Sequence, residues 1–227
     1  MRVTATIVSV LFASLSLGSP INVEVRDPEA VAELEARQFT GTGVTANELK
    51  NGPCKPVTYI FARGSTELGN LGQTVGPALA DQLRSQFDVA VQGVDYPAAL
   101  TTNFFGGSLV GISEMRDLIN LAATKCPDTI IVGGGYSQGA ALTHRSVEDL
   151  SSSVRSRIAG IVTFGDTYNL QSGGRIEGLP QEKLKIICNT GDLVCAGTLV
   201  IAPAHLDYVR RVPEASSFLA DRIRAAQ

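Results

Sequence analysis

The apolar positions of this chain fall into two alternating patterns. In the first pattern, short runs are almost wholly apolar and rich in β-branched residues, which is typical of strands buried on both faces of a sheet. These predicted strands cover residues 57–62, 89–94, 129–132, 160–164 and 184–188.

In the second pattern, apolar residues recur every three or four positions, which predicts amphipathic helices. This spacing is found over residues 75–87, 112–122 and 140–150, and again over 218–223 after Pro213. The alternation predicts an α/β fold in which a five-stranded parallel sheet has helices on both faces. The expected strand order is 2-1-3-4-5, and such sheets place their chemistry at the carboxyl ends of the strands.

The chain has 227 residues, which is enough for one well-packed core and too few for two ordinary domains with a linker. Its formal net charge is −3, and no run of Lys or Arg could neutralise phosphates or anionic lipids. The charge pattern argues against a nucleic-acid partner and against stable membrane association. We expect a monomer that needs no cofactor.

The N-terminal segment indicates export. Arg2 precedes an apolar stretch at residues 3–17, which is typical of a signal peptide covering residues 1–18. A transmembrane helix is the alternative, but the stretch is shorter than the roughly 20 apolar residues that a span needs. Residues 19–37 are rich in acidic side chains and indicate a propeptide, so the mature single domain would cover residues 38–227. We expect a secreted, extracellular protein.

Four cysteines fit an oxidising compartment, where they would form two disulfides with three possible pairings. Cys188 and Cys195 are close enough in sequence to close a local loop, which would leave Cys54 and Cys126 to close a long one. A zinc site would need thiols in two close pairs or more histidines than the two present. We expect no metal.

The most specific motif is Gly-Tyr-Ser-Gln-Gly at residues 135–139, between the third strand and a helix. In a G-x-S-x-G elbow, two glycines allow a strained turn that lifts the serine hydroxyl out of the sheet. A glycine-rich turn with an incidental serine is the structural alternative. The strand before the motif and the helix after it favour Ser137 as a nucleophile.

A serine nucleophile needs a base, and the chain has two histidines. His144 lies two helical turns beyond Ser137, about 10 Å along the axis, so we expect it to be a surface or packing residue. His205 follows the last strand, as the chain order of an α/β-hydrolase triad requires, and is the expected base.

The acid that orients the histidine is expected at Asp192, with Asp166 as the alternative. Both follow strand ends between the nucleophile and the base, but the order Ser, acid, His favours the aspartate after the fifth strand. A short disulfide loop would also fix the position of Asp192. Asp207 is too close to His205 in sequence to be preferred.

An oxyanion hole would require two donors. One is the backbone N–H of Gln138, at the start of the helix after Ser137. The other is expected from the loop after the first strand, because the first and third strands are neighbours in the predicted order. Ser65 in that loop offers a backbone N–H and a hydroxyl, although a turn or N-cap serine is the competing explanation.

Two loops that flank the predicted triad carry more apolar residues than solvent contact favours. These side chains either turn inward and pack, or form flaps that hold an acyl chain. The flap residues are Leu100, Phe104, Phe105, Leu199, Val200 and Ile201.

Four motifs, at residues 62–67, 135–142, 188–195 and 205–208, together resemble those of fungal cutinases, from about Cys54 to the C-terminus. The resemblance implies a small lidless α/β-hydrolase that cleaves cutin or smaller esters. It also implies a catalytic triad of Ser137, Asp192 and His205 and an oxyanion hole formed by Ser65 and Gln138. Two disulfides are implied as well, Cys54–Cys126 and Cys188–Cys195. An acetylxylan esterase, or an inactive binding protein on a hydrolase scaffold, are the alternatives.

Overall fold

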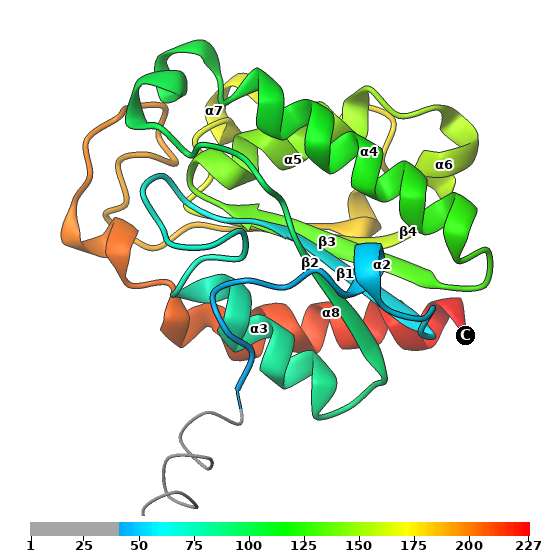
Figure 1. Cartoon of the computed structure of the whole chain (residues 1–227). Coiled ribbons are helices and arrows are strands. Elements are labelled where there is room, and N and C mark those ends of the chain that lie inside the picture. Colours follow the sequence, from blue (N-terminus) through cyan, green and yellow to red (C-terminus); the bar gives the residue numbers. More distant parts are fainter. Residues whose placement is uncertain (1–40) are drawn as a thin grey trace, which may run out of the picture. The chain divides into compact units, whose positions relative to one another are not determined.

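The computed structural model of the chain describes residues 41–227, so the expected signal peptide and propeptide lie outside the described residues. Its centre is a five-stranded sheet with the order β2-β1-β3-β4-β5 (Figure 1). All neighbouring strands are parallel, which confirms the predicted sheet and its order. The strands are β1 (Val57–Ala62), β2 (Val89–Gly93), β3 (Ile130–Tyr136), β4 (Ile158–Phe164) and β5 (Leu184–Ile187).

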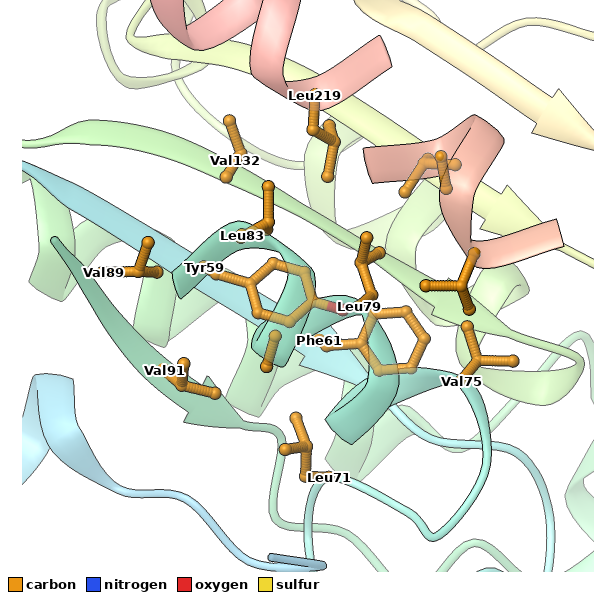
Figure 2. Close-up of a cluster of buried hydrophobic side chains, with 14 of the residues drawn as sticks. Tyr59, Phe61, Leu71, Val75, Leu79, Leu83, Val89, Val91, Val132 and Leu219 are labelled. Carbon is orange, nitrogen blue, oxygen red and sulfur yellow. The ribbon is translucent and has the colours of Figure 1, made fainter. Parts of the chain in front are cut away.

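Helices cover both faces of the sheet, as the alternating pattern predicted. Helices α4 (Leu109–Lys125) and α5 (Gln138–Glu148) lie on one face, and α3 (Val75–Arg84) and α8 (Val212–Ala226) lie on the other (Figure 1). Each layer has its own cluster of buried apolar side chains. In the α3 and α8 layer, Tyr59 and Phe61 from β1 pack beneath Leu79 and Leu83 from α3 (Figure 2).

Short helices that the hydrophobic pattern did not predict occupy the connections. The first short helix after each of β2, β4 and β5 stands at the carboxyl edge of the sheet, where chemistry is expected. The short helices are α2 (Glu48–Asn51), η1 (Leu100–Phe105), α6 (Ser152–Ser156), α7 (Asn169–Ser172), η2 (Gln181–Lys183), η3 (Pro203–Leu206) and η4 (Val209–Arg211).

Strand β3 is longer than its apolar run, because it continues through Gly133, Gly134 and Gly135 to Tyr136. These glycines have no room for side chains. A Cβ on Gly134 would lie 1.8 Å from the carbonyl oxygen of Val162 on the neighbouring strand. The run of glycines therefore extends the strand directly to the turn that carries Ser137.

The two disulfides have the pairing that the family resemblance implied. Cys54 pairs with Cys126, and Cys188 pairs with Cys195. Within residues 41–227, no helix combines the length and apolar character that crossing a membrane requires.

Candidate active site

Ser137 occupies a strained turn between β3 and α5. Its φ of 55° lies in the left-handed region, which residues other than glycine rarely adopt. A Cβ on Gly135 would lie 2.1 Å from the carbonyl oxygen of Gly139, and a Cβ on Gly139 would lie 2.0 Å from that of Ala62. Both glycines of the motif are therefore required by close backbone approach, and the turn projects Ser137 at the carboxyl edge of the sheet.

The structure brings Ser137, His205 and Asp192 together from three separate segments. The Nε2 atom of His205 lies 3.0 Å from Oγ of Ser137, and its Nδ1 atom lies 2.9 Å from Oδ2 of Asp192. All three residues are buried. The imidazole thus stands between a hydroxyl and a carboxylate with one ring nitrogen directed at each, which is the geometry that base-assisted attack by a serine requires.

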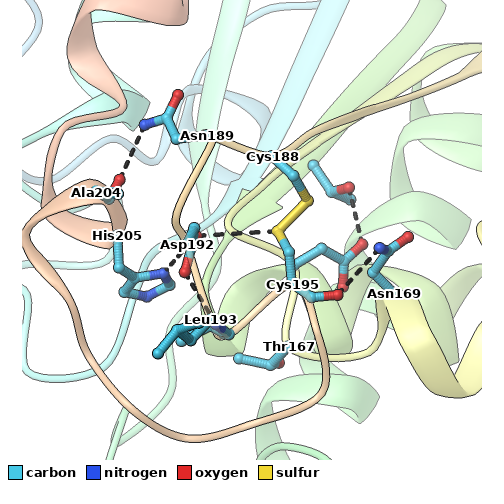
Figure 3. The surroundings of a disulfide bond; sticks show 12 residues. Thr167, Asn169, Cys188, Asn189, Asp192, Leu193, Cys195, Ala204 and His205 are labelled. Atoms are coloured by element: carbon cyan, nitrogen blue, oxygen red, sulfur yellow. Dashed lines mark hydrogen bonds and ion pairs between the residues drawn. A yellow bond between two sulfur atoms is a disulfide. The ribbon is translucent and has the colours of Figure 1, made fainter.

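Asp192 is fixed by the loop that the Cys188–Cys195 disulfide closes (Figure 3). Its Oδ1 atom accepts a hydrogen bond from the backbone N–H of Val194 at 3.0 Å. Its Oδ2 atom accepts one from the hydroxyl of Tyr208 at 2.6 Å, in addition to its contact with His205. Both carboxylate oxygens are therefore held, so the carboxylate cannot rotate away from the imidazole.

Two tyrosines enclose the imidazole. Tyr136 stacks on the His205 ring with centroids 5.4 Å apart, and its hydroxyl donates to the carbonyl of His205 at 2.7 Å. Burial raises the pKa of the Tyr208 hydroxyl above its usual value, and the hydrogen bond to Asp192 raises it further. Tyr208 therefore stays protonated and remains a donor to the carboxylate. Sequence reasoning assigned neither tyrosine a role, although Tyr208 belongs to the motif at residues 205–208.

His144 was expected to be a surface or packing residue, and in the structure it is buried and has a polar partner. The residue is neither exposed nor packed only by apolar groups, because its Nε2 lies 2.7 Å from Oδ2 of Asp166 and both side chains are fully buried. Thr163 donates to the same oxygen at 2.9 Å. Asp166, the alternative acid, therefore contacts His144 and not His205. Its position after β4 places it against α5 and not against His205.

The expected oxyanion residues lie side by side. The side-chain Nε2 of Gln138 donates to Oγ of Ser65 at 3.0 Å, and the side-chain Nδ2 of Asn103 donates to the same oxygen at 3.0 Å. Since Ser65 Oγ accepts from amide groups, its own hydrogen is available to donate elsewhere. Among residues 41–227, no backbone hydrogen bond outside the helices and strands uses the N–H of Ser65 or Gln138. Asn103 was missed, since a loop asparagine carries no signal by itself.

The loop that carries Ser65 is braced by a buried arginine. Arg63 donates to the carbonyls of Glu67 at 2.8 Å and of Tyr96 at 2.6 Å. The carboxylate of Glu67 accepts in turn from the N–H of Gly64 at 2.7 Å and from the hydroxyl of Thr74 at 2.6 Å. These bonds hold the loop between β1 and α3 in place beside Ser137.

The flap residues whose side chains are described are exposed and do not turn inward. The exposed fractions are 58 % for Leu100, 42 % for Leu199, 56 % for Val200 and 52 % for Ile201. Phe104 and Phe105 belong to η1, but their side chains lie outside the described part of the structure. An apolar cavity of about 260 Å³ reaches Ser137, and its other lining residues are Leu100, Asn103, Thr167, Val194, Leu199 and Ile201.

A second cavity, of about 470 Å³, adjoins the first and shares Asn103, Thr167 and Leu199 with it. We call it the polar pocket, because Arg145 and Gln171 add a charged and an amide side chain to its walls. Within the described residues, no group of three His, Cys, Asp or Glu side chains is placed to hold a metal ion.

The parallel sheet, with a serine on the strained turn after β3, defines the chain as an α/β-hydrolase. A family model described as Cutinase matches residues 53–223. The chain belongs to the cutinase family of carboxylic ester hydrolases, as its motifs indicated.

Known members of the family are similar over most of their length. The chain is 51% identical to Cutinase 2 of Fusarium vanettenii over 87% of this chain and 89% of that protein. It is 50% identical to Cutinase CUT2 of Pyricularia oryzae, over 86% and 92%. A structure of Trichoderma reesei cutinase with a phosphonate inhibitor superposes with a TM-score of 0.73 at 32% identity, covering 86% of this chain and 84% of that one.

An acetylxylan esterase structure shares the fold, with a TM-score of 0.57 at 17% identity over 75% of this chain and 99% of that one.

Proposed function

We propose that the protein is a secreted serine esterase that hydrolyses cutin and short- to medium-chain acyl esters through an acyl-enzyme. The observation that carries the proposal is the continuous contact from Ser137 Oγ through His205 to Asp192, at 3.0 Å and 2.9 Å. An inactive binding protein would have no use for this arrangement. The two disulfides fit an oxidising, extracellular destination.

In the proposed reaction, Ser137 Oγ attacks the ester carbonyl while Nε2 of His205 takes the hydroxyl proton. Asp192 keeps Nδ1 protonated and stabilises the imidazolium that forms. The same histidine then gives the proton to the departing alcohol, which leaves an acyl group on Ser137. A water molecule, deprotonated by His205, attacks the acyl carbon and releases the acid.

The negative charge on the carbonyl oxygen would be stabilised by the N–H groups of Ser65 and Gln138 and by the hydroxyl of Ser65. Donors that are already aimed at the oxyanion need no reorganisation during the reaction. The helix α5 begins at Gln138, so its dipole also favours negative charge at this point.

The apolar cavity and the exposed flap residues support an aliphatic acyl group. Each methylene buried there would contribute up to ~0.8 kcal/mol, so we expect butyrate esters to be preferred over acetate esters by about tenfold or more. The exposed Leu199, Val200 and Ile201 are placed to rest on a polyester surface. A site without a lid would be open in solution, so activity would not require a lipid–water interface.

A substrate panel tests the proposal. The protein would be assayed on soluble esters from acetate to palmitate, on cutin and on acetylated xylan, with Ser137→Ala as the blank. We expect kcat/KM to be higher for butyrate than for acetate and hydroxy fatty acids to be released from cutin. If acetate is the best acyl group and acetylated xylan outcompetes every aliphatic ester, the protein is an acetylxylan esterase instead.

A further inference from the structure

The polar pocket is unexplained by ester cleavage alone, although it shares lining residues with the cavity that reaches Ser137. Its volume of about 470 Å³ exceeds the 260 Å³ of the apolar cavity. Asn103, Thr167 and Leu199 line both. A substrate whose carbonyl lies at Ser137 can therefore extend a further group from one cavity into the other.

The wall of the polar pocket is held by buried polar bonds. Asp166 accepts the N–H of Tyr168 at 2.9 Å while its other oxygen contacts His144 at 2.7 Å. The hydroxyl of Thr167 donates to the carbonyl of Ser137 at 3.3 Å. The buried pair of His144 and Asp166 thus ties this wall to the helix that begins after Ser137.

Two further hydrogen bonds brace the segments beside the pocket. The amide of Asn169 in α7 donates to the carbonyl of Cys195 at 3.2 Å, which links α7 to the disulfide loop. The hydroxyl of Thr198 donates to the carbonyl of Leu193 at 2.9 Å. Both segments that contribute to the pocket's lining here, at residues 167–171 and 197–199, are therefore held in place by the fold.

Charge indicates which group the pocket accepts. Among the described residues that line it, Arg145 is the one with a formal charge, and its side chain is partly buried. Arg145 Nη1 donates to the carbonyl of Gly106 at 3.2 Å, which holds the guanidinium against the turn after η1. A guanidinium has five N–H donors and a carboxylate needs two of them, so Arg145 can bind a carboxylate while it keeps other partners.

We propose that the polar pocket is a subsite for a carboxylate carried by the ester substrate, with Arg145 as the binding residue. The inference rests on the proposed function, because it assigns a second group of the same substrate. Hydrolysis inside a polyester leaves fragments that end in a free carboxylate, so such groups arise from the reaction itself. The subsite would favour these charged fragments over neutral esters of equal length.

The position of Arg145 limits the length of substrate that can reach it. Arg145 lies eight residues beyond Ser137 along α5, about 12 Å at the rise of a helix. The carboxylate must therefore be several carbon atoms from the ester carbonyl. A subsite predicts an optimum chain length, whereas a general attraction between charges does not.

Two matched series of esters test the subsite on the acyl side and on the alcohol side. The first compares p-nitrophenyl half-esters of dicarboxylic acids with p-nitrophenyl esters of monocarboxylic acids of equal length. The second compares butyrate esters of ω-hydroxy acids with butyrate esters of the corresponding alcohols. The measured quantity is the ratio of kcat/KM for the charged ester to that for the neutral one, as a function of chain length.

We expect this ratio to pass through an optimum in at least one series and to fall about tenfold there in Arg145→Gln, since charge-assisted bonds to a carboxylate are lost. Arg145→Lys should recover part of the ratio. Arg224→Gln, which removes the same charge from the exposed face of α8, should leave it unchanged. Added salt should lower the ratio in the wild-type protein.

A ratio that is the same in the wild-type protein and Arg145→Gln at every length in both series would overturn the subsite. Equal losses on charged and neutral esters would do so too, because they would assign Arg145 a packing role at Gly106. A wild-type protein that hydrolyses no neutral ester would instead contradict the proposed function, and the subsite with it.

Discussion

Asp192 and Asp166 follow strand ends at the same edge of the sheet, yet they contact different histidines. Each lies within hydrogen-bond distance of a histidine, yet only the histidine beside Asp192 also contacts Ser137. We therefore expect Asp192→Asn to lower kcat on a butyrate ester by about 10⁴-fold, because the imidazole would lose the group that sets its tautomer.

The matched control is Asp166→Asn, which should retain most of the activity. It should lower the melting temperature, because a buried network with His144 and Thr163 would lose its charged acceptor. Both variants would be assayed for kcat and for thermal unfolding. The opposite ranking of the two activities would move the acid to Asp166.

Asn103 is expected to act through Ser65. Its side-chain amide donates to Ser65 Oγ at 3.0 Å, so Asn103→Ala would leave the serine hydroxyl held by Gln138 Nε2 alone and less firmly aimed at the oxyanion. We predict that kcat falls about tenfold while KM for a soluble butyrate ester changes little, since a misaimed oxyanion donor weakens the transition state and not the ground state.

A double-mutant cycle distinguishes this positioning role from a direct one. If Asn103 acts only through the hydroxyl of Ser65, then Ser65→Ala and the double variant should have the same kcat. Additive losses would show that Asn103 acts by a route other than Ser65, such as its contact with Gln138 Nε2 at 3.1 Å or a contact with the substrate.

Ser137 and His205, which the structure brings within 3.0 Å of each other, could be proposed from the sequence. The glycines and flanking elements that indicate Ser137 are local, and elimination left His205 as the candidate base. Asn103 and the bond between His144 and Asp166 were not predictable, because they depend on loops and helices that only the folded chain brings together.

Among the elements, the two disulfides have different expected effects. The Cys54–Cys126 disulfide joins residues 72 apart and lies away from the active site, whereas Cys188–Cys195 joins residues 7 apart around Asp192. Loop entropy predicts roughly 4 kcal/mol of stability from the long loop and about 2.5 kcal/mol from the short one.

Paired Cys→Ser variants should separate stability from activity. Removing the long disulfide should lower the melting temperature more, while removing the short one should lower kcat more, because the acid loop would lose its closure. The measurements are thermal unfolding and kcat at a temperature where both variants remain folded. If the short disulfide can be removed without loss of kcat, it does not position Asp192.

The strands of the sheet could be predicted from the sequence because buried strands are apolar over several consecutive residues. The third strand was underestimated, since Gly133 to Gly135 offer no apolar side chains although close packing requires them there. Helix η1 and helix α7 escaped prediction because each is too short to show a periodic pattern.

At the scale of the whole molecule, buried tyrosines are expected to set the alkaline limit of stability. Burial raises the pKa of Tyr59, Tyr96, Tyr136 and Tyr208 above the usual value. The same groups ionise near pH 10 in the unfolded chain. Their contribution to the free energy of unfolding is therefore constant below about pH 9 and falls as the pH rises past 10, by up to ~1.4 kcal/mol per pH unit for each tyrosine.

Tyr59→Phe tests this expectation far from the active site. Tyr59 is fully buried, and within the described residues its hydroxyl has no hydrogen-bond partner. The variant should be at least as stable as the wild-type protein at pH 7, and its denaturant-unfolding free energy should fall less steeply above pH 10. If the unfolding free energy falls equally steeply with pH in the two proteins, Tyr59 does not contribute to the alkaline loss of stability.

We expect esterase activity to depend on Ser137 as the nucleophile, which the fold positions and His205 activates. The most direct test is the mass of the protein and of its peptides after reaction with a phosphonate ester, followed alongside esterase activity. We expect one phosphonyl group on Ser137, loss of activity in proportion to labelling, and far slower labelling of His205→Ala. Full esterase activity in completely labelled protein, or a label on another residue that abolishes activity, would contradict it.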